Sequence, residues 1–427
     1  MDKLSSFLQS IRPIKDGDIV DQLSYFYSVL AITVSAFIVF GWSFVGTPLE
    51  CWFPPQFKGW WNEYARDYCF AQNTYFLQFT QVGAPKTYFD LVEKPVDIPQ
   101  KYEEREEKLI GYYQWVPFVL VLVACCFFAP VLLWRALCNQ FGISVKAVAE
   151  SVRLQETVSK EGREKHVNKI ARFMDAAIYT KESIHGRNAL TGRSVILLYL
   201  FVKFLYLFNA VAQLFVLQHF IGAKTSWWGV QVLNDLVHGR TWLETGNFPR
   251  VTYCDFDVRE LGNLQHHTVQ CVLLINMLNE KIFVFLWFWY LFVAVITAIS
   301  LLYWTLMSIS ESPGRKMVIS YLGLSDKTLT QSPRAQTLID RFIKETVRPD
   351  GIFLIRLVGF QGGDLVAADL TKALWHGFKT KNHLNDQNNG QTVPTAPVSL
   401  ASPYSGFPTL PRYEEAVTDS PGKESDF

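Results

Sequence analysis

The apolar residues of this chain are concentrated in four long runs, separated by polar segments of very different lengths. Each run reaches about 20 residues, the length that an α-helix needs to cross the hydrocarbon core of a bilayer. The runs occupy residues 25–45, 110–134, 195–222 and 281–307. The pattern therefore predicts a polytopic membrane protein with four transmembrane helices.

The charges of the connecting segments predict the orientation, because cationic side chains near a span resist translocation. Segment 135–194 has 11 Lys or Arg against 6 Asp or Glu. The corresponding counts are 7 against 10 for segment 46–109, and 4 against 6 for segment 223–280. We therefore expect the middle segment and both ends of the chain in the cytoplasm, and the other two segments outside as extracellular loops 1 and 2.

The cysteines support the same topology independently. Cys51 and Cys69 lie in the first predicted extracellular loop, and Cys254 and Cys271 lie in the second. An even number of cysteines on the oxidising side is what a disulfide framework needs. Four cysteines allow three pairings, and the spacing does not choose between bonds within a loop and bonds between loops. Zinc is the alternative ligand, but without a C-x-x-C pair we expect no metal site.

The remaining segments complete the predicted domain organisation. Basic amphipathic sequence in the cytoplasmic loop and the segment after the last span both predict helices, which together would form a helical region on the cytoplasmic side. After residue 380 the composition changes to Asn, Gln, Gly, Ser and Pro, which is typical of disorder. The predicted order is an N-terminal segment 1–24, spans 25–45, 110–134, 195–222 and 281–307, extracellular loops 46–109 and 223–280, cytoplasmic loop 135–194, C-terminal helical domain 308–379 and tail 380–427.

The first residues of the chain have the pattern of a short amphipathic helix. Apolar side chains recur at positions 4, 7, 8 and 11, and a proline at position 13 ends the pattern. The residues away from this apolar face are Asp2, Ser5, Ser6 and Ser10. Such a helix could lie on the membrane surface or fold into the mouth of a pore, and the pattern by itself favours neither.

Catalytic motifs are missing from the sequence. There is no G-x-S-x-G, no phosphate-binding glycine loop and no H-E-x-x-H, so we expect neither an enzyme nor a cofactor. No nucleic-acid partner is expected either. His238, His266 and His267 in the second extracellular loop could at most act as a pH sensor. The acidic run at 102–108 could hold divalent cations or form a solvated face.

One heptapeptide points to a known family. The second span begins with Y-Y-Q-W-V-P-F, formed by Tyr112, Tyr113, Gln114, Trp115, Val116, Pro117 and Phe118. This string resembles the signature of the innexins, the gap-junction proteins of invertebrate animals. Four further stretches are similar to innexin patterns: D-G-D-I-V-D-Q-L before the first span, P-L-E-C-W-F-P-P-Q-F and Y-C-F-A-Q-N-T-Y-F in the first loop, and R-P-D-G-I-F-L-I-R after the last span. The resemblance covers about residues 16–375, and pannexins are distantly similar.

The resemblance implies both a fold and a function. The fold is an α-helical polytopic membrane protein, a four-transmembrane-helix bundle with disulfide-tied extracellular loops that contain short β-strands and a helix, and with a helical cytoplasmic dome. The implied function is that of a gap-junction channel subunit of the plasma membrane. A homo-oligomeric ring, an octamer by resemblance, would dock with a ring in the opposed cell, with other innexins as further partners, and would pass ions and small molecules passively.

The resemblance also implies roles for particular residues. Cys51 would pair with Cys271 and Cys69 with Cys254, a nested arrangement that ties the two outer loops together. The N-terminal segment would fold into the pore entrance and place its polar face near the lumen. Two alternatives stay open: an undocked pannexin-like release channel, and a junctional adhesion protein or obligate heteromeric subunit that does not conduct alone. From its position alone, Lys203 inside the third span is expected to extend its ammonium group towards the lipid headgroups rather than to line the pore.

Overall fold

A computed structural model describes residues 17–55, 57–77, 99, 102–140, 148, 160–185, 192–222, 227–238, 248–325 and 333–390. The chain divides into two compact units, residues 1–378 and 379–427, and the first contains the elements discussed below. Among the described residues, four helices are long and apolar enough to cross a membrane. They are Ile19–Phe44, Tyr112–Cys138, Ser194–Ile221 and Leu274–Ile309. The four-span fold predicted from hydropathy is therefore confirmed.

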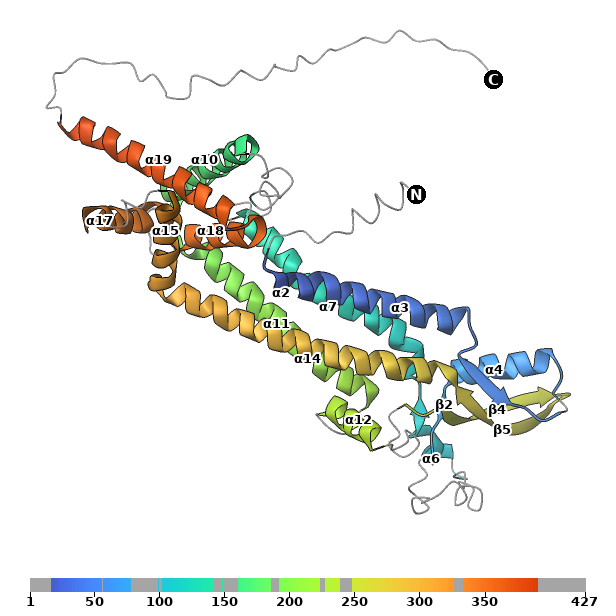
Figure 1. Ribbon diagram of the computed structural model, residues 1–427. Helices are drawn as coiled ribbons and strands as arrows, with labels where there is room; N and C mark the ends of the chain where they lie inside the picture. The colour runs from blue at the N-terminus through green and yellow to red at the C-terminus, as the bar shows by residue number, and fades with distance from the viewer. Residues whose placement is uncertain are drawn as a thin grey trace, which may run out of the picture. The chain divides into compact units, whose positions relative to one another are not determined.

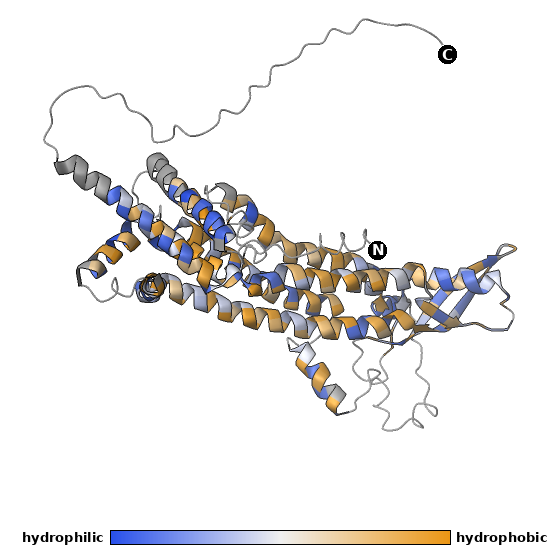
Figure 2. Cartoon of the chain, turned by 45° about the horizontal axis from the view of Figure 1, so that its top comes forward, coloured by the Kyte–Doolittle hydropathy of each residue, from blue (hydrophilic) through white to orange (hydrophobic). Residues whose placement is uncertain are grey.

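The four spans pack side by side (Figure 1), and apolar residues follow their whole length (Figure 2). The first span consists of α2 (Ile19–Gln22), a π-helical turn η1 (Leu23–Tyr27) and α3 (Ser28–Phe44). The others are α7 (Tyr112–Gln140), α11 (Ser194–Ile221) and α14 (Leu274–Ile309). Helix α3 contacts α7, and α11 contacts both α7 and α14.

Two of the spanning helices begin earlier in the sequence than their apolar runs. The first begins at Ile19 rather than near 25, and the fourth begins at Leu274 rather than near 281. In the fourth, the amide of Asn276 donates to the carbonyl oxygen of Pro249 at 2.9 Å, and Glu280 forms an ion pair with Arg250 at 3.0 Å. Asn276 and Glu280 interrupt the hydropathy signal, but each of them has a partner in the loop before β4, so the helix can begin earlier.

Strands from both predicted outer loops form a single antiparallel sheet. Its order is β1 (Leu49–Trp52), β5 (Asn263–Leu273), β4 (Val251–Glu260), β2 (Thr74–Tyr75) and β3 (Leu109–Ile110). Helices α4 (Trp60–Gln72), α6 (Tyr102–Glu106) and α12 (Trp228–Val237) belong to the same loops. We call these strands and helices the sheet domain. It lies at the end of the bundle where α14 begins (Figure 1).

Helices also cover the other end of the spans. They are α10 (Lys160–His185), α15 (Glu311–Ser325), α17 (Pro333–Phe342), the π-helical turn η4 (Ile343–Val347), α18 (Arg348–Gly362) and α19 (Asp364–Gly390). We call them, up to residue 378, the helical cap. Helix α19 continues to Gly390, past the point at which the composition predicts the tail to begin, and the rest of that predicted tail lies outside the described residues.

The buried apolar side chains form two clusters, one at each end of the spans. One joins the cap to the bundle around Trp134, Tyr199 and Trp304. The other joins the sheet domain to the bundle, and here Gly229 of α12 approaches α14 closely. A Cβ at Gly229 would lie 2.1 Å from a ring carbon of Trp287, so only glycine permits this contact.

The cap is also attached to the third span by a polar contact. Carboxylate oxygen Oδ1 of Asp350, in α18, accepts hydrogen bonds from the backbone N–H groups of Val195 and Ile196, both at 3.1 Å. These groups belong to the first turn of α11, where backbone donors have no partner within the helix. A buried carboxylate there also complements the positive end of the helix dipole. Asp350 thus holds the start of α11 against the cap.

Candidate functional site

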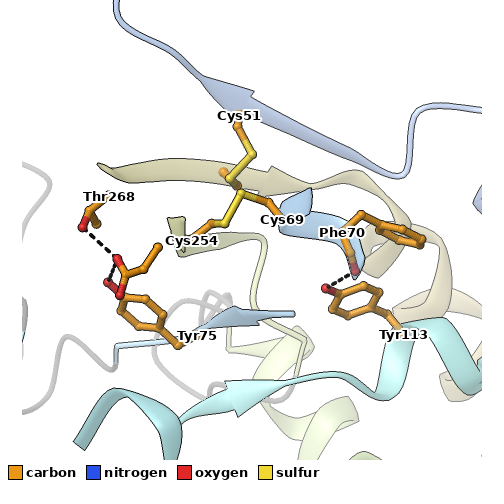
Figure 3. The surroundings of a disulfide bond; sticks show 9 residues. Cys51, Cys69, Phe70, Tyr75, Tyr113, Cys254 and Thr268 are labelled. Atoms are coloured by element: carbon orange, nitrogen blue, oxygen red, sulfur yellow. Dashed lines mark hydrogen bonds between the residues drawn. A yellow bond between two sulfur atoms is a disulfide. The ribbon is translucent and has the colours of Figure 1, made fainter. Parts of the chain in front are cut away.

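Two disulfides join the two outer loops. Cys51 is bonded to Cys271 and Cys69 to Cys254, across sequence separations of 220 and 185 residues. Cys51 and Cys271 are directly opposite each other on β1 and β5, whereas Cys69 reaches β4 from helix α4 (Figure 3). Both bonds connect the first loop with the second, in the nested order that the resemblance implies. They attach an edge strand and a helix to the central hairpin.

The two disulfides lie next to each other. The sulfur atoms of Cys51, Cys69 and Cys271 are all within 4.8 Å of one another, a spacing that three zinc ligands could also have. All three sulfurs are already bonded to another sulfur, and zinc binds thiolates. The chemistry of the site therefore favours the disulfide framework over the zinc alternative.

The acidic run before the second span is attached to the sheet through its one arginine. Arg105 of α6 forms an ion pair with Asp255 of β4 at 2.5 Å. Asp255 also accepts hydrogen bonds from the hydroxyl groups of Tyr75, at 3.1 Å, and Thr268, at 2.7 Å. Burial and the neighbouring carboxylate raise the pKa of Tyr75 well above its usual value, so this hydroxyl remains a donor. The Asp255 carboxylate thus joins three separate elements to β4.

The heptapeptide at the start of α7 fastens the second span to helix α4. The side-chain amide of Gln114 donates to the carbonyl oxygen of Phe70 at 2.5 Å and to Oδ1 of Asn73 at 3.0 Å. The hydroxyl of Tyr113 points to the same Phe70 carbonyl at 3.4 Å (Figure 3). Carbonyl groups in the last turn of a helix need partners from outside the helix, and the heptapeptide supplies them.

Only part of the heptapeptide behaves as an aromatic belt. Aromatic side chains at the end of a span commonly lie at the level of the lipid headgroups, but the side chain of Tyr113 is fully buried. Trp115 is 63% exposed, as is typical of a ring at the membrane surface. The last three residues of the heptapeptide also differ in burial, since Val116 and Pro117 are buried and Phe118 is exposed.

A cluster of charges is buried where the first span begins. The ammonium group of Lys203, in α11, lies 2.6 Å from Oδ2 of Asp18 and 3.0 Å from Oδ1 of Asp21. It also donates to the hydroxyl of Ser300 in α14 at 2.7 Å. Lys203 is completely buried, so the prediction that its ammonium extends to the headgroups is wrong. Two carboxylates held inside the bundle stabilise the ammonium there, since an unpaired charge in this position would be very costly.

Further donors complete the cluster. The indole N–H of Trp304 donates to Oδ2 of Asp18 at 3.0 Å, and the hydroxyl of Tyr199 donates to Oδ2 of Asp21 at 2.7 Å. Asp18 and Asp21 also cap α2, each side chain accepting from the other residue's backbone N–H. The cluster therefore connects the first, third and fourth spans at one point.

The cluster could have been suspected from sequence. Two aspartates three residues apart precede an apolar run, and a single lysine lies inside another run. Opposite charges within a membrane protein usually pair. The lysine and the two aspartates could therefore have been predicted to form an ion pair. The predicted pore residues, Asp2, Ser5, Ser6 and Ser10, lie outside the described residues. The described chain begins with Gly17, which is buried directly against Asp21.

Comparison with known proteins agrees with the geometry. The family model "Innexin" matches residues 17–378. "Innexin unc-9" of Caenorhabditis elegans is 40% identical over 386 residues, which cover 88% of this chain and 95% of that protein. "Innexin-12" of Caenorhabditis elegans is 36% identical over 384 residues, covering 89% and 93%, and "Innexin-19" of Caenorhabditis briggsae is 33% identical over 410 residues, covering 88% and 90%. With four apolar spans and a disulfide-linked sheet domain, the chain therefore belongs to the innexin family, the multi-pass channel proteins of gap junctions.

Proposed function

We propose that this chain forms an intercellular channel by itself. Its subunits assemble into a ring, an octamer by resemblance, and two rings in apposed cells dock through their sheet domains. Ions and small molecules then pass without an energy source. The observation that carries the proposal is the β4–β5 hairpin, which two disulfides tie to the first loop and which continues beyond its neighbouring strands.

The sheet domain faces outside and the helical cap faces the cytoplasm in this proposal. Disulfides form on the oxidising side of the plasma membrane, and both lie in the sheet domain. The excess of Lys and Arg in the segment 135–194, which contains α10 of the cap, supports the same orientation. Both ends of the chain are then cytoplasmic.

The outer part of the hairpin has the properties of a docking surface. Strand β1 pairs only with residues 270–273 of β5, and β2 pairs with β4 only at Tyr253. Among the described residues, no further strand pairs with either edge of the hairpin beyond these points, and such an edge can pair with a strand of another chain. Leu261, at the turn, is fully exposed, an arrangement that is unfavourable in water and favourable at an interface.

A hollow beside the hairpin offers a complementary surface. Its volume is about 680 Å³, and aromatic side chains of α4 and of the segment before it line one wall. Phe256 and Leu264 of the hairpin line the other wall. Aromatic residues in such a hollow are suited to anchor an interface. We assign this hollow to contact with a second copy of the chain, either in the same ring or across the gap.

Dual voltage clamp of two apposed cells tests the docking proposal. We expect conductance between the cells only when both express the chain, because each ring needs a partner. Surface labelling in the same cells checks delivery to the membrane. Surface protein with single-cell current but no junctional current would show an undocked channel. Surface protein with neither current would show an adhesive role or an obligate partner, and both results contradict the proposal.

The N-terminal segment is proposed to line the pore entrance. The charge cluster around Lys203 fixes Asp18 and Asp21 inside the bundle, directly after Gly17, the first described residue. Asp2 would then form a ring of carboxylates, and such rings favour cations. We expect Asp2→Lys to shift the selectivity towards anions, measured as a shift of the reversal potential in a KCl gradient. Asp2→Glu is the matched control, and an unchanged reversal potential for Asp2→Lys would contradict the assignment.

A further inference from the structure

A pocket lies where the third and fourth spans leave the membrane on the cap side. It has a volume of about 130 Å³, many times the space that a single water molecule needs. Its walls come from the end of α14, the start of α15, the end of α17, the turn η4 and the first half of α18, together with Arg193 and Ile196 at the start of α11. The pocket therefore adjoins the ends of two spans and the cap.

The pocket is largely apolar inside. Trp304 and Met307 of α14 and Ile352 and Phe353 of α18 contribute to its lining. On the opposite face of α14, Leu302, Leu306 and Ile309 are exposed and form an apolar stripe that is suited to lipid contact. The pocket therefore lies on the inner side of the fourth span, between this helix and the cap.

Cationic side chains dominate the polar part of the lining. Among the described residues there are five cations against two carboxylates: Arg193, Arg315, Lys344, Arg348 and Arg356 against Glu311 and Asp340. Both carboxylates already have an arginine partner. Arg315 binds Asp340 through two hydrogen bonds, at 2.6 and 3.1 Å, which lower the pKa of that carboxyl, and Arg193 lies 3.7 Å from Glu311. The pocket therefore has an excess of positive charge.

Arg348 is held in an unfavourable backbone conformation beside the pocket. Its φ is 55° and its ψ is 173°, a region that is almost restricted to glycine. Its side chain packs on Gly192, where an added Cβ would come within 3.0 Å of the Arg348 Cδ. Strain of this kind persists only where the surrounding structure imposes it, and it is concentrated at binding sites. Arg348 also lines the pocket, and its Nε donates to the carbonyl oxygen of Glu345 at 3.3 Å.

We propose that this pocket binds an anionic phospholipid of the cytoplasmic leaflet whose headgroup carries additional phosphates. The phosphates contact the cationic rim, where arginine offers paired donors, and an acyl chain lies against the apolar lining. A soluble phosphate compound would leave the apolar lining without a role. The inference rests on the proposed orientation, with the cap in the cytoplasm. The lipid would bridge two spans and the cap.

The test is a binding measurement on the purified full chain in detergent, with dioctanoyl phosphatidylinositol 4,5-bisphosphate as the probe. The pocket variant is Lys344→Gln combined with Arg348→Gly, since glycine tolerates the backbone conformation at 348. We expect binding about 30-fold weaker than for the unmodified chain, because two cations at about 1 kcal/mol each correspond to this factor. The matched control is Lys316→Gln with Arg341→Gln, which removes two exposed cap cations outside the pocket and should change binding less than about threefold.

Three further measurements make the outcome decisive. Lys344→Arg with Arg348→Lys should keep most of the affinity, which separates loss of charge from loss of folding. Dioctanoyl phosphatidylcholine and inositol trisphosphate should both bind at least about tenfold more weakly, since the first has no phosphate cluster and the second no acyl chain. Equal binding of inositol trisphosphate, equal loss in the control variant or no binding of the probe would each overturn the proposal. Because no channel opening is needed, the result is independent of the docking experiment.

Discussion

Replacing Lys203 by methionine is expected to destabilise the folded protein by about 3–5 kcal/mol, the range found when one partner of a buried ion pair is removed. Asp18 and Asp21 would then lie beside each other without the ammonium group that now contacts both, at 2.6 and 3.0 Å. Thermal unfolding of the purified protein in detergent and surface labelling in cells both measure the effect. Most of the surface protein should be lost, since typical total stabilities are about 5–15 kcal/mol.

Two further variants show whether charge is the cause. Lys203→Met combined with Asp18→Asn and Asp21→Asn removes all three charges and should recover part of the stability, because neutral amides are easier to bury than unpaired carboxylates. Lys281→Met removes an exposed lysine from α14 and should have little effect. Normal stability of Lys203→Met would show that the cluster contributes nothing to folding, and would also remove the anchor proposed for the N-terminal segment.

Removing the bond between Cys51 and Cys271 by the double substitution Cys51→Ser with Cys271→Ser is expected to abolish junctional conductance. A cross-link of this kind contributes about 2–5 kcal/mol to a small disulfide-stabilised domain, and here it holds β1 against β5 beside the proposed docking hairpin. Dual voltage clamp with surface labelling measures the loss. Cys125→Ser, which changes a cysteine in the second span, is the control and should conduct normally.

The single substitution Cys51→Ser should be more harmful than the double one. It leaves the thiol of Cys271 within 4.8 Å of the Cys69 sulfur, so that the thiolate can attack the neighbouring disulfide. Peptide mapping under non-reducing conditions should then recover Cys271 bonded to Cys69 or Cys254. If mapping finds only Cys69 bonded to Cys254 in this variant, exchange does not occur and the two variants should behave alike.

The sequence by itself determined the four spans, because hydrophobicity over about 20 residues is a local property that needs no partner. The heptapeptide at Tyr112 to Phe118 identified the family for the same reason, as a contiguous string. The charges of the connecting segments predicted the compartment of the cysteines, and the family resemblance implied their pairing. Only the tertiary structure brings β1 opposite β5 and so gives that pairing a geometric basis.

Only the tertiary structure decided the positions of the polar side chains, because these positions depend on partners that are distant in the sequence. Lys203 is 185 residues from Asp18, and without that partner its best position would be near the headgroups. The ring of Tyr113 would also suit a membrane surface. In the folded chain its hydroxyl donates instead to the carbonyl oxygen of Phe70, which is 43 residues away in the sequence. Cations from four segments likewise meet in one pocket only after folding. Burial of a polar side chain is favourable only with a partner, and folding brings the partners together.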